Sequence, residues 1–546
     1  MLWLIAAPSV FANNALQNHP SAYLAMHADD PVDWQLWHSD TLQQARASNQ
    51  LILVSSGYFS CHWCHVMQQE NYKNSQVAQV MNQSFVSVKI DRELNPELDD
   101  YLIDFARKTT GRAGWPLHVI LTPEGQPIAS FIYLPSDQLI QTLNQIQAWW
   151  LQNPEHIRRL AQPEQPETRL QKQSELTQAL HQYLLQNIDS FSGGLQGTQK
   201  FPNSPLLLSL LNQPDLAADL EDWLILTLEQ MQNEHLYDHI HGGFFRYTVD
   251  PNWQIPHFEK MLYDNAQLAR VYFLAAQRFQ RDDFLQTARQ TLNYIEQELV
   301  SATTGLAHSS QSALDAQHRD GGRYLWDKAQ LQAALNESEY QRVHQAWLLD
   351  NPPPIELGWL PKPINHQAWW SIRDKLAQRP KLNDDKQLLG WNGLLLSAYA
   401  AAMQTAPQDD IQLKGHALTK RLLDVMQSAQ APKAINDQGE WLNQAGLEDY
   451  ALVIKGLQDW QQASQLDLSQ AIAQLRRQAE RQFFTAQGWL NSTENLLPGL
   501  VAKPALADTA LPSPSAILQC RLESIPLETE VWRYASYTNP ALGCLE

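Results

Sequence analysis

The sequence predicts two structural regions, an α/β domain followed by a larger, almost wholly helical one. Residues 13–150 alternate between apolar, β-prone runs and segments with helical spacing, which is typical of a sheet covered by helices. From about residue 175 onward, apolar residues recur almost only at helical spacing. A length of 546 residues also favours more than one domain.

Strands and helices alternate in the first region. We expect strands at 51–56, 85–90, 116–121 and 128–133, and helices at 64–83 and 99–109. A turn at Thr122-Pro123-Glu124-Gly125 separates the last two strands. Pro116 opens the third strand, which should lie next to the loop that follows the first strand.

A polar stretch with several prolines, residues 151–172, is expected to be the linker. Beyond it, short breaks separate helical segments that should pack as antiparallel hairpins, at 223–231, 264–277, 283–299, 393–403, 416–427, 448–466 and 468–484. Three of the breaks look related: Gly193-Gly194-Leu195, Gly242-Gly243-Phe244 and Gly321-Gly322-Arg323. Irregular repetition of this kind predicts helical hairpins arranged in a ring or a stack.

Composition limits the classes of partner. A formal net charge of −19 argues against a nucleic-acid-binding surface, which needs clustered Lys and Arg. No segment after the N-terminus reaches the ~18 apolar residues that a membrane span requires. The 19 Trp weakly favour a carbohydrate ligand, because indole rings stack on sugar rings. Nothing in the sequence predicts a cofactor.

The most informative stretch is Ser60-Cys61-His62-Trp63-Cys64-His65. It places two thiols three positions apart, between a β-prone run and a helix whose N-terminus stabilises a thiolate. The pattern predicts a redox-active pair in which Cys61 is the nucleophile and Cys64 resolves the mixed disulfide. His62, as a cation between the thiols, would lower the thiolate pKa further.

Two other interpretations of this pair stay open, a structural disulfide and one half of a zinc site. The zinc site is disfavoured because four ligands packed within five residues cannot surround one ion tetrahedrally, so no metal is expected. Cys520 and Cys544 near the C-terminus either pair in an oxidising compartment or act as small buried hydrophobic residues.

Residues 1–12 are almost wholly apolar and end in Val10-Phe11-Ala12, a pattern similar to a signal-peptide cleavage site. The segment lacks a positively charged start and is short. We therefore expect the remnant of a signal peptide and a periplasmic location, with a buried N-terminal segment of a cytoplasmic protein as the alternative.

Three further runs look chemical rather than structural. They are Gly111-Arg112-Ala113-Gly114-Trp115-Pro116, residues 242–265 with His-Phe-Glu-Lys-Met-Leu-Tyr-Asp-Asn at their end, and Asn383-Asp384-Asp385-Lys386 followed by Trp391-Asn392-Gly393.

The chain resembles the family of spermatogenesis-associated protein 20 and its bacterial relatives over nearly its whole length. The residues that carry the resemblance are 60–67 and 242–265, together with Asp30-Pro31-Val32-Asp33-Trp34, Val88-Lys89-Ile90-Asp91-Arg92-Glu93, Gly114-Trp115-Pro116, Lys200-Phe201-Pro202, Asp384-Asp385-Lys386, Trp391-Asn392-Gly393 and Leu447-Glu448-Asp449-Tyr450.

The resemblance implies a thioredoxin-like domain at 13–150 and a six-hairpin, (α/α)6 glycosidase-like domain at 173–546. It also implies a cis Trp115–Pro116 bond that faces the thiols, where the alternative is an ordinary strand-opening proline. The chain departs from the family pattern at 193–202 and around Asp315-Ala316-Gln317-His318. Because it ends at Glu546, the last hairpin is expected to be incomplete.

A cavity at the centre of such a ring is lined by loops and helix N-termini, where carboxylates and histidines do acid–base work. The spacing of Glu259 and Tyr263 puts both on one face of a helix. The candidates for this cavity are His257, Glu259, Lys260, Tyr263, Asp264, Arg246, Asp250, Trp253, Asp384, Asp385, Trp391, Asn392, Glu448 and Asp449. The alternative is a buried polar network that braces the ring, and Trp115, Trp253 and Trp391 are either stacking platforms or core.

Three functional hypotheses follow. The first is a thiol–disulfide oxidoreductase that acts through Cys61 and Cys64, assisted by His62 and Pro116, on a protein thiol or disulfide. The second is an epimerase-like or hydrolase-like enzyme that acts on a small carbohydrate in the helical cavity, with a vestigial or regulatory first domain. The third is a non-catalytic binding scaffold. A resemblance of fold does not decide among them, because function resides in sites.

Overall fold

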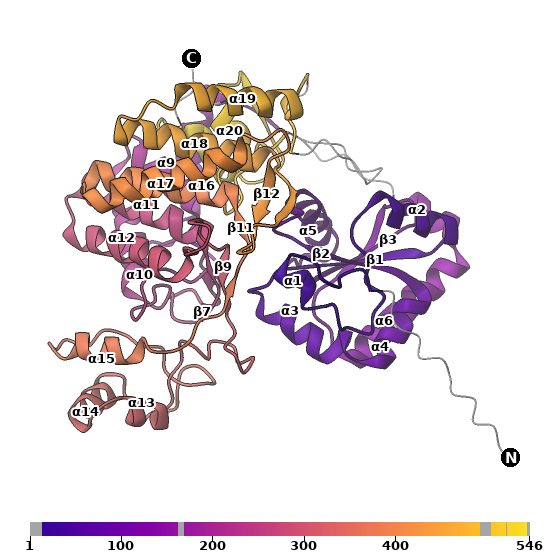
Figure 1. The fold of residues 1–546 in the computed structure, drawn as a ribbon, viewed down its shortest axis with the longest axis horizontal. Coiled ribbons are helices and arrows are strands. Elements are labelled where there is room, and N and C mark those ends of the chain that lie inside the picture. The colour runs from indigo at the N-terminus through magenta and orange to yellow at the C-terminus, as the bar shows by residue number, and fades with distance from the viewer. Residues whose placement is uncertain (1–13, 162–168, 487, 492–503, 520, 543–546) are drawn as a thin grey trace. The chain divides into compact units, whose positions relative to one another are not determined.

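The computed structural model describes residues 14–161, 169–486, 488–491, 504–519 and 521–542. These residues form two compact units, which are coloured indigo to violet and magenta to yellow in Figure 1. Before the stretch 162–168, which is not described, the chain belongs to the first unit, and from residue 169 it belongs to the second. Residues 1–12, Cys520 and Cys544, for which we made predictions above, lie outside the described residues.

The first unit is a four-stranded mixed sheet with the order β2-β1-β3-β4. β1 is parallel to β2 and antiparallel to β3, and β4 is antiparallel to β3. The strands are β1 (Leu51–Gly57), β2 (Phe85–Asp91), β3 (Leu117–Leu121) and β4 (Pro127–Phe131). β1, β2 and β3 are buried throughout, because helices cover both faces of the sheet. All four expected strands are therefore present.

Helices α2 and α5 cover one face of this sheet, and α4 packs on β2 and on α6 (Figure 1). The helices of the first unit are α1 (Ala22–Ala25), α2 (Ser39–Ser48), α3 (His62–Met67), α4 (Ser75–Ser84), α5 (Pro96–Thr110), α6 (Ser136–Gln152) and α7 (Pro154–Leu160), with a π-helical turn η1 (Gln68–Tyr72). The single helix expected at 64–83 is wrong. The chain leaves the first helix after η1, and Asn74 starts α4 as a new N-cap by accepting a hydrogen bond from Gln76 N.

The described residues of the expected linker 151–172 are mostly in helices and a strand. Its first part forms α7, where Ile157 is fully buried and Arg158 pairs with Glu124 of the first unit. Its last part forms strand β5 (Arg169–Lys172), which pairs with β16 (Ser524–Leu527) of the second unit. Pro154 therefore does not lie in a loop, since it opens a helix at its first position.

The second unit is a closed ring of inner helices with a second layer outside it. The inner helices, each packed on the next and the last on the first, are α9 (Ser204–Asn212), α11 (Leu262–Phe279), α16 (Leu389–Thr405), α18 (Leu447–Ser464), α20 (Pro514–Leu518) and the 3₁₀-helix η3 (Val531–Thr538). The outer helices are α8 (Gln173–Asn187), α10 (Ala218–Asn233), α12 (Asp282–Tyr294), α17 (Asp409–Met426) and α19 (Ser469–Phe483). This is an α/α toroid, in which the short α20 and η3 stand where a full last hairpin would close the ring.

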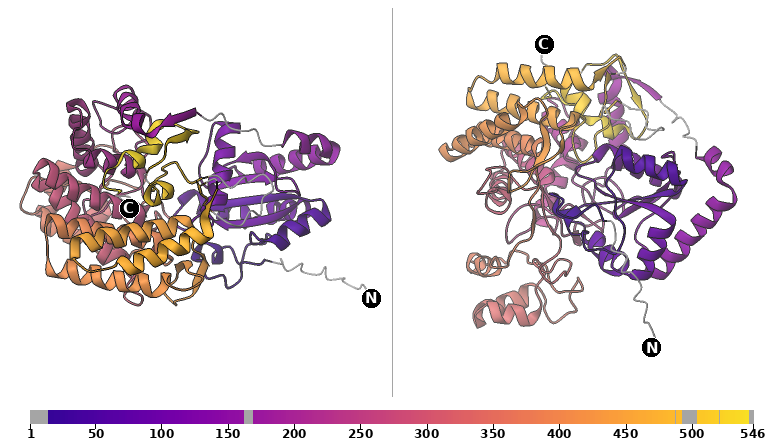
Figure 2. Two further views of the ribbon diagram at one scale, coloured as in Figure 1. Left: turned by 90° about the horizontal axis from the view of Figure 1, so that it is seen from above. Right: turned by 45° about the vertical axis from the view of Figure 1, so that its right-hand side comes forward.

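Close packing of the inner layer depends on two glycines. Helices α16 to α19 lie side by side in the ring (Figure 1 and Figure 2). A Cβ at Gly393 of α16 would stand 2.6 Å from the carbonyl oxygen of Leu452, and a Cβ at Gly456 of α18 would stand 2.3 Å from the carbonyl oxygen of Gly393. These two backbones can touch only because neither position carries a side chain.

Short strands join the loops at the N-terminal ends of the inner helices into small sheets. They are β6 (Tyr247–Thr248), β7 (Pro256–His257), β8 (Lys260–Met261), β9 (Ser310–Gln311), β10 (Asn383–Asp384), β11 (Gln387–Leu388), β12 (Pro432–Ile435), β13 (Trp441–Gln444), β14 (Phe484–Thr485) and β15 (Gly488–Trp489). The orders β10-β9-β8 and β11-β12-β13 link the segments that precede α11, α16 and α18. Residues far apart in the sequence therefore meet at this end of the ring.

The segment between α12 and α16 adds a π-helical turn η2 (Ile295–Leu299) and a separate helical cluster. The cluster has its own hydrophobic core and consists of α13 (Lys328–Ala334), α14 (Glu337–Ala346) and α15 (Trp369–Leu376). Among the described residues, no helix combines the length and the apolar character that crossing a bilayer requires.

Three breaks were expected to be related turns. Two of them have the same turn type, and the third does not. Residues 189–194 and 238–243 close the same pair of backbone hydrogen bonds around a glycine with positive φ. The third turn with these bonds spans 301–306 and contains Gly305. Residues 321–323 bond differently, because Gly321 N donates to the carbonyl of Ala313. The Gly-Gly pair at 321–322 was therefore a misleading signal.

Candidate active sites in the two units

Cys61 and Cys64 form a disulfide at the N-terminus of α3, with 5.3 Å between their Cα atoms. Cys61 is the N-cap residue, and its Sγ accepts a hydrogen bond of 3.1 Å from the backbone N of Cys64. The pair thus lies at the positive end of a helix, where a thiolate is stabilised. His62 is the first residue of the same helix and is partly buried.

The Trp115–Pro116 peptide bond is cis, as the resemblance implied. Leu117, the next residue, pairs with Ser56 near the end of β1. Pro116 therefore stands at the sheet edge where β1 ends and where the chain enters the loop to Cys61. The strand order thus brings the cis proline and the cysteines to the same edge.

Both cysteine residues are buried, including Cys61, the expected nucleophile. Cys61 is 3% exposed and Cys64 is fully buried, whereas Trp63 between them is 45% exposed. The Trp63 ring lies 5.1 Å from the ring of Tyr133, whose hydroxyl donates to Glu70. Trp63, which lies between the two cysteines in the sequence, is therefore packed on Tyr133 and still partly open to solvent.

A carboxylate organises the residues on the proline side of the cysteines. Asp99 accepts hydrogen bonds from Trp115 Nε1 at 2.9 Å and from Ser56 Oγ at 2.5 Å, and it pairs with Arg92 Nε at 3.2 Å. The Arg92 guanidinium lies 4.1 Å from the Trp115 ring centre and 5.3 Å from that of Tyr58. Trp115 is therefore held in place from two sides, as a bracing residue rather than an open stacking platform.

A buried lysine lies in the sheet beside the strand that leads to the disulfide. Lys89 of β2 donates a hydrogen bond of 2.9 Å to Ser55 Oγ of β1. Its Nζ stands 4.4 Å from the ring centre of Tyr72 and 5.2 Å from that of Tyr23. Burial lowers the pKa of Lys89 to about 7, although Asp30 partly offsets this. The sequence signal was a charge in the middle of an apolar strand, and we assigned it no role.

In the second unit, His257 and Glu259 meet directly before α11. His257 Nδ1 lies 3.2 Å from Glu259 Oε1, and Arg246 Nη1 lies 3.2 Å from Glu259 Oε2. Burial alone would lower the pKa of His257, but the Glu259 carboxylate outweighs it and the net pKa is raised. The His257 ring stacks on Tyr247, which stacks on Phe201, and Phe201 is 41% exposed. Burial raises the pKa of Tyr247 to about 12.

Other expected residues gather before α16 and α18. Asp384 and Lys386 form a fully buried ion pair with 2.5 Å between Oδ2 and Nζ. Asp385 beside them is half-buried, and burial followed by the charges of Asp384 and Asp437 raises its pKa. Lys433 pairs with Asp449 at 2.8 Å, and that carboxylate also accepts from Gly446 N at the start of α18.

Several expected residues brace the fold instead of facing a cavity. The Asp250 carboxylate accepts hydrogen bonds from backbone N–H groups of the loop 252–255 and so holds this loop. Trp253 is fully buried, and its Nε1 donates a hydrogen bond to the carbonyl of Ser192. Lys260 is buried against Asp238, and Asn392 bonds the backbone of Ala307 and Leu388.

Tyr263 and Trp391 are buried and pack edge to face on each other, with 4.7 Å between their ring centres. They therefore belong to the core and are not stacking platforms. Asp264 is buried near the start of α11, and Glu448 is partly buried at the start of α18.

In the described part of the second unit, the space that the inner helices share near the ring axis is small. All six inner helices line a cavity of only about 20 Å³. Arg270 lies 3.1 Å from Asp459, and Lys455 lies 2.8 Å from the same carboxylate. Burial would raise the pKa of Asp459, but these two cations outweigh it and the pKa is lowered. A space of this size holds about one water molecule and no sugar ring.

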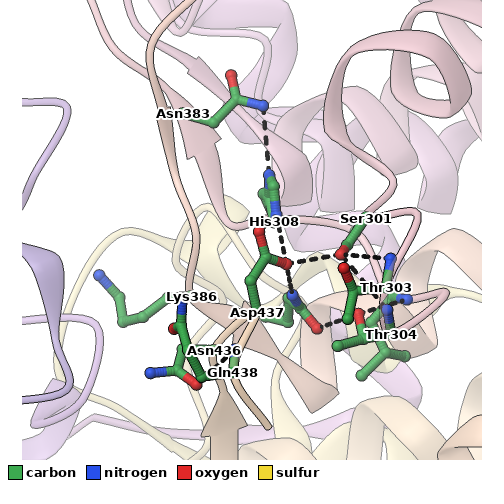
Figure 3. Close-up of polar contacts among 12 residues, drawn as sticks. Ser301, Thr303, Thr304, His308, Asn383, Lys386, Asn436, Asp437 and Gln438 are labelled. Carbon is green, nitrogen blue, oxygen red and sulfur yellow. Dashed lines mark hydrogen bonds and ion pairs between the residues drawn. The ribbon is translucent and has the colours of Figure 1, made fainter.

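Sequence reasoning missed His308 and Asp437, which join three loops at the ring's N-terminal end. His308 Nε2 lies 3.0 Å from Asp437 Oδ1, and its Nδ1 faces the Asn383 amide at 3.3 Å (Figure 3). Asp437 also accepts from Ser301 Oγ at 2.6 Å and from Gln387 Nε2 at 2.8 Å. Both ring nitrogens of His308 form polar contacts, so this residue connects the loops that carry Asp437 and Asn383. No local motif predicts this cluster, because its members are spread over more than 130 residues.

Comparison with known proteins gives a family model for the first unit and solved structures of low sequence identity. A family model described as "Thioredox_DsbH: Protein of unknown function, DUF255" matches residues 13–168, which identifies the first unit as a thioredoxin-like domain. Among solved structures, cellobiose 2-epimerase from Bacillus thermoamylovorans B4167 is 12% identical and covers 59% of this chain and 76% of its own, with a TM-score of 0.40. A structure titled "DsbH Oxidoreductase" is 17% identical over 21% of this chain and 85% of its own, with a TM-score of 0.18.

Curated relatives match most of the chain. Spermatogenesis-associated protein 20 from Homo sapiens is 30% identical in a match that covers 83% of this chain and 67% of the human protein. The protein of the same name from Rattus norvegicus is 30% identical in a match that covers 84% of this chain and 68% of the rat protein. Since these matches span both units, the chain belongs to the spermatogenesis-associated protein 20 family.

Proposed function

We propose that the first unit catalyses thiol–disulfide exchange through Cys61 and Cys64. The observation that carries the proposal is their disulfide at the N-terminus of α3, at the same sheet edge as cis-Pro116. A helix N-terminus lowers the pKa of a thiol, and Cys61 as N-cap would benefit most. The match of this unit to the thioredoxin-like family model supports the same chemistry.

The reaction needs only the two cysteines and a dithiol or disulfide substrate. A substrate thiolate attacks Cys61 Sγ, the Cys61–Cys64 bond breaks, and its electron pair leaves on Cys64 as a thiolate. A second substrate thiolate then attacks the substrate sulfur of the mixed disulfide and releases Cys61. The substrate is oxidised by two electrons, the enzyme pair is reduced, and the same steps in reverse reduce a substrate disulfide.

The test is equilibration of the purified full-length chain with defined ratios of reduced and oxidised glutathione. We expect the Cys61–Cys64 disulfide to open and close reversibly at one reduction potential, read by mass spectrometry of the alkylated peptide. A disulfide that stays closed at every glutathione ratio under native conditions, and opens only on unfolding, would make this pair structural and would overturn the proposal.

A second candidate function has its own support in the second unit. His257 with a raised pKa, the Glu259 carboxylate and a stack that ends in the exposed Phe201 ring combine an acid–base pair with a sugar-binding type of surface. We propose acid–base chemistry on a small carbohydrate as the runner-up. Turnover of a sugar that is lost in His257→Ala and Glu259→Gln would support it, and no binding across a broad sugar panel would exclude it.

A further inference from the structure

Gly57, the last residue of β1, marks a close approach of two reactive side chains. A Cβ built on this glycine would stand 2.8 Å from Cys64 Sγ and 2.2 Å from the hydroxyl oxygen of Tyr23. The sulfur and the hydroxyl therefore flank the same point in the backbone. Any larger residue at 57 would displace one of them, so glycine is required here by contact and not by backbone conformation.

The Tyr23 side chain is fully buried, and its hydroxyl has no hydrogen-bond partner among the described residues. The ring is fixed edge to face against His27 at 5.3 Å, and the Lys89 ammonium lies 5.2 Å from its centre. A buried hydroxyl without a partner is costly. Such a group, here in the helix α1, invites a functional explanation.

We propose that the Tyr23 hydroxyl donates a hydrogen bond to Cys64 Sγ when the disulfide opens. This inference rests on the proposed exchange reaction and adds a residue to it. In the disulfide, the sulfur is neutral and a weak acceptor. When a thiolate attacks Cys61, the electron pair of the broken bond moves onto Cys64, and this sulfur becomes an anion beside a waiting donor.

Tyr23 acts as a donor and not as a base. Burial raises the pKa of Tyr23 well above its usual value, and the charges of nearby carboxylates add to this effect. The hydroxyl therefore keeps its proton throughout the reaction. The titratable and charged groups that face Tyr23 are His27, Asp30, Tyr72, Lys89, Asp91 and Asp99. None of them changes in the variants below except Tyr72, which serves as the control.

Tyr23→Phe tests the proposal because it removes only the hydroxyl oxygen. The rate at which excess reduced glutathione reduces the oxidised full-length protein can be measured at pH 7 by stopped-flow Trp fluorescence. We expect this rate to be several-fold lower in Tyr23→Phe than in the unaltered protein. A leaving thiol with a higher pKa leaves more slowly. In a Cys61→Ser background, we expect the pKa of the Cys64 thiol to rise by about one unit, since a hydrogen bond to a charged group is worth about 1.5–3 kcal/mol.

The matched control is Tyr72→Phe. Tyr72 is equally buried, but its hydroxyl bonds Ser55 Oγ at 2.8 Å and His118 Nε2 at 2.6 Å. We expect this control to lose stability and to keep the rate of reduction and the Cys64 pKa. Tyr23→Phe should do the opposite, with unchanged or higher stability, because the hydroxyl that it removes has no partner in the oxidised protein.

Two outcomes overturn the inference: an unchanged rate and Cys64 pKa in Tyr23→Phe, or equal changes in Tyr23→Phe and Tyr72→Phe. Failure of the proposed function looks different, because glutathione would then fail to open the disulfide in the unaltered protein. Even in that case, the contact can be tested by comparing the Cys64 pKa of Cys61→Ser with that of Cys61→Ser/Tyr23→Phe.

Discussion

Cys64→Ser is expected to accumulate a covalent adduct between Cys61 and a disulfide substrate, whereas Cys61→Ser is expected to lose exchange completely. Cys61 caps α3, where the helix N-terminus stabilises its thiolate for attack. The serine at 64 cannot attack the mixed disulfide that forms, so the adduct persists. Intact-mass spectrometry after reaction with oxidised glutathione would show an added glutathionyl group that is removed by dithiothreitol.

The control for this result is the triple variant Cys64→Ser/Cys520→Ser/Cys544→Ser, which should accumulate the same adduct as Cys64→Ser. It shows that the adduct does not form on Cys520 or Cys544. Exchange that survives at full rate in Cys61→Ser would contradict the assignment of Cys61 as the nucleophile. An adduct on Cys64 in the Cys61→Ser variant, with none on Cys61 in Cys64→Ser, would reverse the two roles.

Asp238→Ala is expected to destabilise the second unit by about 3–5 kcal/mol. Asp238 holds the buried Lys260 ammonium, with 2.5 Å between Oδ2 and Nζ, and pairs with His241 at 3.0 Å. Burial alone would raise the pKa of Asp238, but Lys260 and His241 outweigh it and hold the pKa well below its usual value. Removal of this carboxylate leaves a buried cation without its counter-charge. Urea unfolding, followed by amide exchange of α11 peptides, measures the loss.

Two further variants make this prediction specific. Asp424→Ala removes an exposed partner of Lys420 and should leave the unfolding midpoint unchanged, because exposed ion pairs contribute little. The double variant Asp238→Ala/Lys260→Met should recover part of the lost stability, since it removes the unpaired charge as well. Equal losses from Asp238→Ala and Asp424→Ala would show that the buried pair does not brace the ring.

Much of the fold could be predicted from local patterns. Each strand of the first unit is a short apolar run bounded by turn residues, and all four were found where we expected them. The helix expected at 64–83 failed because apolar periodicity continues across Asn74, although its side chain caps a new helix there. The ring was suggested by repeated turns, yet one of the three expected repeats, at 321–323, is not equivalent to the others.

The candidate sites were predictable only where chemistry is concentrated in a short motif. The pairs Cys61–Cys64 and His257–Glu259 are local, and their contacts in the structure follow from short spacings. Tyr23 approaches Cys64 only because α1 and α3 meet at Gly57, which no spacing in the sequence reveals. His308 and Asp437 likewise come together only because the small sheets place their loops side by side, so the contact between them depends on the complete fold.

The most direct test of the account is the pH dependence of Cys61 alkylation in the reduced full-length chain. Iodoacetamide labelling, with the Cys61 peptide quantified by mass spectrometry, gives the pKa of this thiol alone. We expect a pKa well below the ~8.5 of a free thiol, because the α3 N-terminus favours the thiolate. A Cys61 thiol with an ordinary pKa, or one that does not react under native conditions, would contradict the proposed exchange reaction.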